Sequence, residues 1–212
     1  MLRIKHLRLR WYIHVVVIFF WIGAVYAQSE GVKENIYSLG KLKATDSVTT
    51  LRIGDQAPDF TLPAVGGDKI SLSQYQGKKN VVLSFVPAAW TPVCTYQWPV
   101  YDIARYIFDN NDAILLGITV DNIPTLYAWT NHMGAKGGKV WFPVLSDFFP
   151  HGKVTKKYGI FRSEGFSERA LFVIDKRGII RYIDVHDINE RPSLVKLAKA
   201  LEALLNYQLK HK

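Results

Sequence analysis

The chain has 212 residues, which is enough for one domain with a full hydrophobic core. Hydrophobic residues make up 49% of it and charged residues 21%, and this globular composition excludes a largely disordered protein. The net charge is +9, and outside the first 27 residues the basic residues are scattered and form no stripe interleaved with aromatic residues, so a nucleic-acid partner is not predicted.

A basic and then apolar segment opens the chain. Residues 1–10 carry four arginine and lysine residues and no acid, an apolar run follows from Trp11 to Val25, and Ala27 precedes Gln28. This pattern is typical of a secretory signal peptide over residues 1–27. The run falls short of the roughly 20 residues that cross a bilayer, which favours a cleaved leader over a membrane anchor. Removing four positive charges from +9 leaves +5, and an exported, periplasmic or extracellular protein is predicted, membrane-tethered only if the leader is retained.

Residues 28–47 are polar and mixed, and they are interpreted as a flexible linker before a single domain over residues 48–212. The domain begins with short strands broken by Pro63 and by a Gly66-Gly67-Asp68 turn. A turn of this composition between two strands predicts a β-hairpin.

Buried strands and helices then alternate. Nearly continuous apolar runs predict strands that are buried on both faces, and apolar residues spaced by three or four predict helices. The predicted elements are a strand over 80–86, a helix over 92–111 kinked by Pro99, a strand over 113–120, a helix over 124–133, a strand over 139–147 and a short helix over 151–159 ending at Gly159.

Two strands joined by a turn at Gly178 and a final helix complete the predicted domain. Pro192 suits the start of that helix. One face of it is apolar, formed by Leu194, Leu197, Leu201, Leu204 and Leu205. The alternation of strands and helices predicts an α/β fold with a sheet covered by helices.

Cys94 is the only cysteine, so no intrachain disulfide can form. Thr91 suits the N-cap of the helix after the first buried strand and Pro92 its first position, which places Cys94 in the first turn. The helix dipole and free backbone N–H groups there stabilise a thiolate. The open alternative is a small buried hydrophobic residue.

The segment Pro87-x-x-x-Thr91-x-x-Cys94 resembles the active-site motif of the peroxiredoxins, the alkyl hydroperoxide reductase/thiol-specific antioxidant (AhpC/TSA) family. The resemblance extends from about Leu51 to Leu205 and includes "IGDQAPDFTLP", "GITVD" and "ERALFVIDKRGIIRYIDV". The single cysteine and "SDFFPHG" are most similar to the one-cysteine, AhpE-like branch.

The resemblance implies a thioredoxin-like fold, with a central mixed sheet flanked by helices and an N-terminal β-hairpin. It implies that Cys94 is the peroxidatic thiolate, that Thr91 contacts the peroxide, that Pro87 shields the sulfur and that Arg169 stabilises charge as the O–O bond breaks. Each has a simpler alternative: Thr91 only a cap, Pro87 only a turn residue and Arg169 only a surface residue.

Gln97 and Trp90 are further candidates for the substrate pocket. Gln97 stands where the family often has a glutamate that orients an arginine, and it can form hydrogen bonds but no ion pair. Trp90 is interpreted either as part of an apolar collar around the sulfur or as core packing. The same two interpretations apply to Trp98, Phe142 and Phe148.

The predicted activity is reduction of hydrogen peroxide, alkyl hydroperoxides or both, as antioxidant defence outside the cytoplasm. With no second cysteine, the resulting sulfenic acid needs an external thiol or a thioredoxin-like protein as reductant. No cofactor is predicted, and the six histidines have no metal-ligand spacing. Whether the chain forms a homodimer is left open.

Two alternative functions compete with this prediction. A thioredoxin-like disulfide reductase needs a Cys-x-x-Cys pair, and the chain has Thr91-x-x-Cys94 instead. A peroxiredoxin-like binding or chaperone module without activity is the second alternative, and a cysteine of ordinary, slow reactivity would favour it.

Overall fold

A computed structural model of the chain describes residues 36–133 and 139–210. The predicted leader over residues 1–27 lies outside the described residues. Ser38–Lys212 form one compact unit, and all the described helices and strands belong to it. Among the described residues, no helix has the length and apolar character needed to span a membrane.

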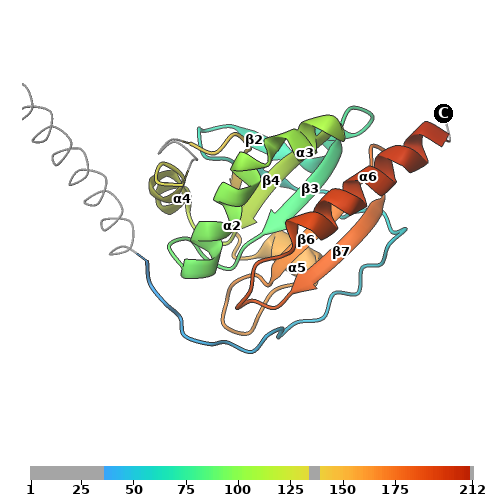
Figure 1. The fold of residues 1–212 in the computed structure, drawn as a ribbon. Coiled ribbons are helices and arrows are strands. Elements are labelled where there is room, and N and C mark those ends of the chain that lie inside the picture. The colour runs from blue at the N-terminus through green and yellow to red at the C-terminus, as the bar shows by residue number, and fades with distance from the viewer. Residues whose placement is uncertain (1–35, 134–138, 211–212) are drawn as a thin grey trace, which may run out of the picture. The chain divides into compact units, whose positions relative to one another are not determined.

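The unit contains a two-stranded hairpin, a five-stranded sheet and several helices (Figure 1). The strands are β1 (Thr61–Pro63), β2 (Lys69–Ser71), β3 (Asn80–Phe85), β4 (Ala113–Thr119), β5 (Val144–Ser146), β6 (Arg169–Ile174) and β7 (Ile180–His186). The helices are the 3-10 helix η1 (Leu72–Tyr75) and the α-helices α2 (Pro92–Ile103), α3 (Arg105–Asn110), α4 (Ile123–Thr130), α5 (Lys153–Lys157) and α6 (Leu194–Lys210).

The central sheet is mixed, with strand order β5-β4-β3-β6-β7. Strands β3, β4 and β5 are parallel, whereas β6 runs antiparallel to both β3 and β7. Strands β1 and β2 form the predicted antiparallel hairpin, with Leu62 paired to Ile70. This arrangement confirms the predicted thioredoxin-like architecture with an N-terminal β-hairpin.

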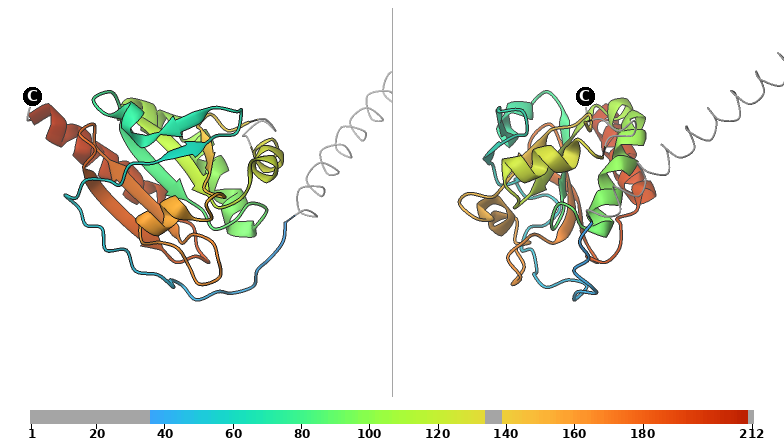
Figure 2. Two further views of the ribbon diagram at one scale, coloured as in Figure 1. Left: turned by 180° about the vertical axis from the view of Figure 1, so that it is seen from behind. Right: turned by 90° about the vertical axis from the view of Figure 1, so that its left-hand side faces the viewer.

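Two hydrophobic layers cover the sheet because successive strand residues point to opposite faces. On β3, Val82 packs into one layer with residues of α2, α4 and α6, whereas Val81 and Leu83 pack into the other with residues of the hairpin and α5. Figure 1 shows α2, α3 and α6 in front of the sheet, and Figure 2 shows the hairpin and α5 from behind. The sheet is therefore buried on both faces, as the apolar runs predict.

Most elements differ from their predicted ranges by a few residues at their ends, including α5, which is shorter than the helix predicted over 151–159, and two differ more. The helix predicted over 92–111 is divided at Ala104, whose φ of −89° and ψ of 22° depart from helical values, and α2 continues through Pro99. The strand predicted over 139–147 is reduced to β5, which pairs with β4 only after Pro143. Proline lacks the N–H group that a strand interior uses, and this accounts for the later start of β5.

The segment before the hairpin has neither helix nor strand between residues 36 and 50. The sequence predicts a linker over 28–47, and within its described part residues 42–47 nevertheless form hydrogen bonds to residues 162–189. The division of the chain at residue 48 stays a prediction.

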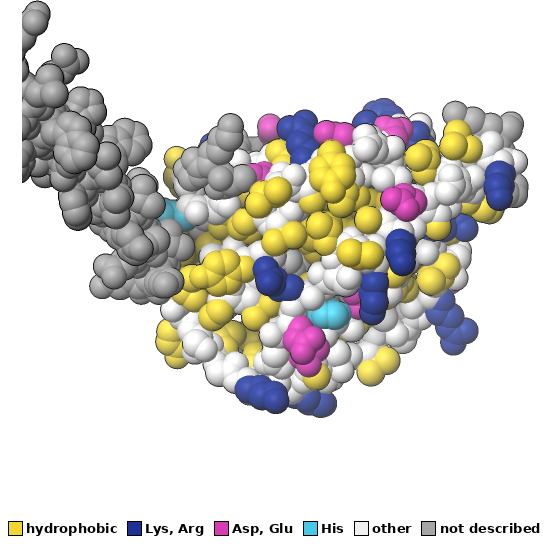
Figure 3. All heavy atoms as spheres, in the orientation of Figure 1, with side chains coloured by type: hydrophobic (Ala, Val, Ile, Leu, Met, Phe, Trp, Pro, Cys, Tyr) yellow, Lys and Arg dark blue, Asp and Glu magenta, His cyan; other side chains and the backbone are white. Residues whose placement is uncertain are grey.

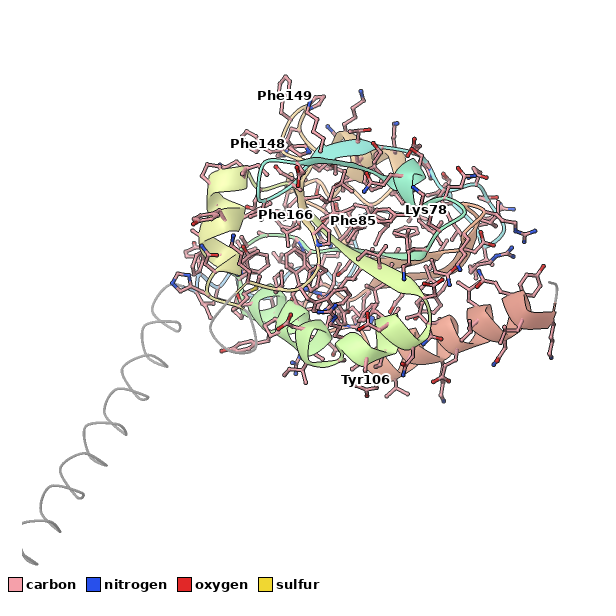
Figure 4. The ribbon with its side chains drawn as sticks, turned by 90° about the horizontal axis from the view of Figure 1, so that it is seen from above. Lys78, Phe85, Tyr106, Phe148, Phe149 and Phe166 are labelled. Atoms are coloured by element: carbon pink, nitrogen blue, oxygen red, sulfur yellow. The ribbon has the colours of Figure 1, made fainter. Side chains whose placement is uncertain are left out.

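The surface over α2 and α3 carries exposed hydrophobic side chains, including Tyr96, Ile103 and Tyr106. Figure 3 shows hydrophobic side chains gathered on this face, with arginine and lysine side chains distributed around and among them. Seen from above, Phe148 and Phe149 project outward at the edge of the unit (Figure 4).

Gly117 of β4 allows α2 to approach the sheet closely. A Cβ atom at this position would lie 2.7 Å from Cζ2 of Trp98, which is fully buried on α2 one turn after Cys94. We expect Gly117→Ala to lower the free energy of unfolding by about 1–3 kcal/mol, because overpacking a filled core forces side chains or backbone to move. Urea denaturation followed by circular dichroism measures this change.

The double variant Gly117→Ala/Trp98→Phe is the control, since the smaller ring leaves room for the added methyl group. The two changes should be less destabilising together than the sum of the single variants. If the changes in the free energy of unfolding were strictly additive, contact with the Trp98 ring would not be the reason why residue 117 must be glycine.

Candidate functional site

The site is built at the start of α2, directly after β3. Thr91 has the extended backbone of an N-cap, Pro92 is the first helical residue, and Cys94 lies in the first turn, as predicted. The Thr91 side chain accepts no capping hydrogen bond from the helix, and Oγ1 donates instead to the carbonyl of Ala88 at 2.9 Å. The hydroxyl is therefore tied to the loop between Pro87 and the helix.

The Cys94 sulfur is fully buried, and a guanidinium group lies against it. Nη2 of Arg169 is 3.4 Å from Sγ of Cys94. Arg169 is the first residue of β6, 75 positions along the chain, and β6 pairs with β3 so that Phe85 lies opposite Ala170. The sheet register thus brings the start of β6 beside the end of β3, where the cysteine loop begins.

Arg169 is held by two further groups. Nη1 donates to Oε1 of Gln97 at 2.6 Å, and Nε and Nη2 donate to the carbonyl of Ile188 at 3.2 and 3.0 Å. Among the described residues, no carboxylate forms an ion pair with it, although its side chain is 1% exposed. A buried cation is costly without an anionic partner. Of these contacting groups, the Cys94 sulfur is the one that can become an anion.

Gln97 contacts Arg169 through a side chain that is itself fixed by hydrogen bonds. Its Nε2 donates to Oγ of Ser84 and to the hydroxyl of Tyr101, both at 3.3 Å, so Oε1 is turned toward Arg169. Burial raises the pKa of Tyr101, which keeps the phenol neutral beside this cluster. A neutral amide fixes the guanidinium without competing with the sulfur for its charge.

A pocket of about 310 Å³ opens beside the cysteine helix. Pro87, Thr91 and Arg169, three of the four residues predicted to carry catalysis, line it together with residues 38–42, 92–93 and 188–189. Cys94 lies under this wall through its contact with Arg169. The structure therefore brings the predicted Pro87, Thr91, Cys94 and Arg169 together at one place.

The aromatic candidates divide into buried and exposed residues, and Trp98 and Phe142 share one core cluster with Cys94. Trp90 packs its ring at 5.3 Å from that of His132, and its φ of 58° lies in the left-handed region. Trp98 and Phe142 pack edge to face in the core with ring centroids 5.6 Å apart, whereas Phe148 points outward and is 48% exposed. The core-packing interpretation holds for Trp98 and Phe142, and Phe148 belongs to neither group.

Several residues of the site have no signal in the sequence. Ser84 is one polar residue within an apolar strand, and its hydroxyl accepts from both Gln97 and the Trp98 indole. The carbonyl of Ile188 and the side chain of Asn189 lie between β7 and α6, in a stretch that carries no recognisable motif. Within residues 36–133 and 139–210, no group of three or more His, Cys, Asp or Glu is placed to hold a metal ion.

Comparison with known proteins agrees with the resemblance found in the sequence. Residues 53–183 match the AhpC/TSA family. Alkyl hydroperoxide reductase E of Mycobacterium tuberculosis is 38% identical over 143 residues, which are 66% of this chain and 89% of that protein. The 2-cysteine chloroplastic peroxiredoxin of Chattonella marina var. antiqua is 31% identical over 160 residues, covering 73% of this chain and 81% of that protein.

The fold has matching solved structures. The reduced 2-Cys peroxiredoxin of Plasmodium vivax superposes with a TM-score of 0.68 and 29% identity, covering 74% of this chain and 84% of that one. AhpC of Mycobacterium bovis superposes with a TM-score of 0.67 at 21% identity, covering 74% and 94%, and supports the fold alone.

Proposed function

The chain belongs to the AhpC/TSA family and is a peroxiredoxin, a thiol peroxidase, and from this premise we propose that Cys94 reduces hydroperoxides through a cysteine sulfenic acid. The observation that carries the proposal is the buried pair of Cys94 and Arg169. A guanidinium with 1% exposure and no carboxylate partner among the described residues favours a negative charge on the sulfur at 3.4 Å.

The reaction begins with attack of the Cys94 thiolate on the outer oxygen of the hydroperoxide. A sulfur–oxygen bond forms and the oxygen–oxygen bond breaks, so sulfur loses two electrons and the peroxide gains them. The departing oxygen takes a proton and leaves as water or an alcohol. Arg169 stabilises the negative charge that develops on the oxygens, because its guanidinium is already fixed by Gln97 and by the carbonyl of Ile188.

Recycling requires an external thiol, since Cys94 is the only cysteine. A first thiol condenses with the sulfenic acid, releasing water and forming a mixed disulfide. A second thiol attacks this disulfide, returns Cys94 to the reduced state and leaves with the first as an oxidised pair. A small thiol or a thioredoxin-like protein fits this chemistry equally.

Thr91 and Pro87 are proposed to act on the bound peroxide, Thr91 by a hydrogen bond and Pro87 by limiting access of water. Both line the pocket beside the sulfur, and the Thr91 hydroxyl donates to the carbonyl of Ala88. Its oxygen lone pairs remain able to accept a hydrogen bond from a peroxide O–H group. Pro87 has no backbone N–H, so it adds an apolar surface that limits water at this wall.

The place of action is proposed to be outside the cytoplasm. The basic start and apolar run of residues 1–27 support export, with cleavage after Ala27. N-terminal sequencing of the protein recovered from a secretory host tests this point. A protein that begins at Met1 in the cytoplasmic fraction would contradict it.

The proposed chemistry is tested by mixing the reduced full-length protein with one equivalent of hydrogen peroxide. Trp90 and Trp98 lie within a few residues of Cys94, so stopped-flow tryptophan fluorescence should report the reaction. We expect oxidation far faster than that of free cysteine at the same pH, and a mass increase of one oxygen on the peptide that contains Cys94.

The result that contradicts the proposal is equally direct. If Cys94 reacts no faster than free cysteine, the buried guanidinium does not activate the sulfur and Cys94 is not the peroxidatic residue. Addition of excess dithiothreitol after oxidation should restore the original mass, as expected for a sulfenic acid and not for more highly oxidised forms.

A further inference from the structure

One wall of the pocket beside Cys94 comes from a segment far from it in sequence. Residues 38–42 line the pocket of about 310 Å³ together with Pro87, Thr91 and Arg169. Residues 38–47, here called the strap, precede the segment that matches the AhpC/TSA family, which begins at residue 53. The residues that form this wall of the pocket therefore lie outside the part of the chain that matches the family.

The strap is fastened next to the pocket by paired hydrogen bonds. The backbone N–H of Leu42 donates to Oδ1 of Asn189 at 3.0 Å, and Nδ2 of Asn189 donates back to the carbonyl of Leu42 at 2.9 Å. The N–H of Ile188 donates to the carbonyl of Ala44 at 2.9 Å. Because the Ile188 carbonyl also accepts from Arg169, the strap and the catalytic guanidinium share one anchoring segment.

A buried ion pair holds the rest of the strap. Arg162 and Glu168 are fully buried and lie 2.7 Å apart. Oε1 of Glu168 accepts from the N–H groups of Asp46 and Ser47 at 2.6 and 2.7 Å, and Nη2 of Arg162 donates to the carbonyl of Lys43 at 3.0 Å. Buried charged groups fixed in this way leave little freedom to the backbone that they hold.

The pocket is larger and more apolar than hydrogen peroxide requires. Its volume lies at the lower end of the roughly 300–1,000 Å³ typical of small-molecule sites, whereas a water molecule occupies about 30 Å³ in the liquid. Its apolar lining consists of Leu39, Leu42, Pro87, Pro92, Val93 and Ile188. Hydrogen peroxide has no group that would use this surface, but an organic hydroperoxide does.

We propose that Leu39 and Leu42 are specificity-determining residues, and that the strap forms an apolar subsite for the alkyl or aryl substituent of an organic hydroperoxide. The proposal rests on the proposed function of Cys94. With its substituent against the two leucines, the hydroperoxide places its O–O group toward Thr91, Arg169 and the sulfur. Attack by Cys94 then breaks the O–O bond and releases the substituent as an alcohol.

The test compares two peroxides in the full-length protein. The rate constants for oxidation of Cys94 by hydrogen peroxide and by cumene hydroperoxide are measured for the wild type and for Leu39→Ser/Leu42→Ser. We expect the cumene hydroperoxide rate to fall about tenfold, the equivalent of about 1.4 kcal/mol, because the aryl group loses its apolar contacts. The hydrogen peroxide rate should stay within about twofold.

Val48→Ser is the matched control. Val48 follows the strap in the same segment, is 87% exposed and does not line the pocket, so its replacement should leave both rates unchanged. A second variant, Asn189→Ala, leaves both leucines in place but removes the paired hydrogen bonds to Leu42. It should lower the cumene hydroperoxide rate and should speed tryptic cleavage after Lys41 and Lys43.

The outcomes separate the subsite from the function on which it rests. Equal losses with both peroxides, or no loss with either, would overturn the subsite while leaving Cys94 as a peroxidatic residue. A faster reaction with cumene hydroperoxide in the serine variant would also overturn it, because the strap would then be a steric barrier. A wild-type protein whose cysteine reacts slowly with both peroxides would remove the proposed function, and the subsite with it.

Discussion

Replacing Cys94 with serine is expected to abolish peroxide consumption, because the chain then contains no thiol to accept the peroxide oxygen. Serine is nearly isosteric, and its hydroxyl can accept the hydrogen bond that Nη2 of Arg169 gives to the sulfur. The fold should therefore persist while the reaction stops. Consumption of hydrogen peroxide with dithiothreitol as reductant measures the loss, and thermal unfolding by circular dichroism checks the fold.

A matched double variant separates the position of the thiol from its presence. Cys94→Ser/Ser193→Cys keeps one thiol per chain but moves it to the position before α6, where the Ser193 hydroxyl already accepts a weak hydrogen bond from the N–H of Lys196. That thiol would also lie at a helix start, but it would lack Arg169. We expect no activity above that of free cysteine. Substantial turnover would show that a helix N-terminus alone activates the thiol.

The local part of the site could be predicted because it depends on neighbours in sequence. Thr91 and Pro92 define the start of α2, and the apolar run before them defines β3, so the place of Cys94 at a strand-to-helix junction follows from a short stretch of sequence. The capping role that the same stretch predicts for Thr91 is wrong for its side chain. The hydroxyl donates to Ala88 because the loop turns its carbonyl toward it, and residue type alone does not reveal this.

The long-range part of the site could not be derived from pattern. Arg169 follows a glutamate before a buried strand, and only the family resemblance distinguishes it from the other arginines. Its contact with Cys94 depends on the antiparallel register of β3 and β6, which no local signal determines. The role of the Ile188 carbonyl could not be predicted either. Every residue has a backbone carbonyl, and only the tertiary fold determines which of them accepts a hydrogen bond from Arg169.

The hydrogen bonds of the strap have no signal in its composition. Residues 38–47 are polar and contain no periodic apolar pattern, which is typical of a linker. Their hydrogen bonds are made to Asn189, Glu168 and Arg162, which lie far along the chain. These partners form hydrogen bonds with the backbone groups of the strap, so the strap needs no helix or strand. Its sequence therefore has no periodic pattern from which its contacts with the domain could be predicted.

Replacing Arg169 with glutamine is expected to lower the rate constant for oxidation of Cys94 by hydrogen peroxide about 10²–10³-fold. Loss of one preorganised charged donor at a site of developing negative charge has an effect of this size in other enzymes. Glutamine can still donate to the carbonyl of Ile188 or accept from neighbouring groups, so the packing is largely kept. Stopped-flow fluorescence of the reduced variant measures the rate, and the rate of alkylation by iodoacetamide at the same pH reports whether the thiol has become less reactive in general.

Two variants define what the guanidinium supplies. Arg169→Lys keeps the charge but cannot contact Gln97, Ile188 and Cys94 together, so its rate should lie between those of the wild type and the glutamine variant. Arg177→Gln removes an arginine that is largely exposed, and it should leave the rate unchanged. If a correctly folded Arg169→Gln protein were oxidised as fast as the wild type, the sulfur would not need a cationic neighbour. Arg169, which is buried without a carboxylate partner among the described residues, would then have a structural role and not a catalytic one.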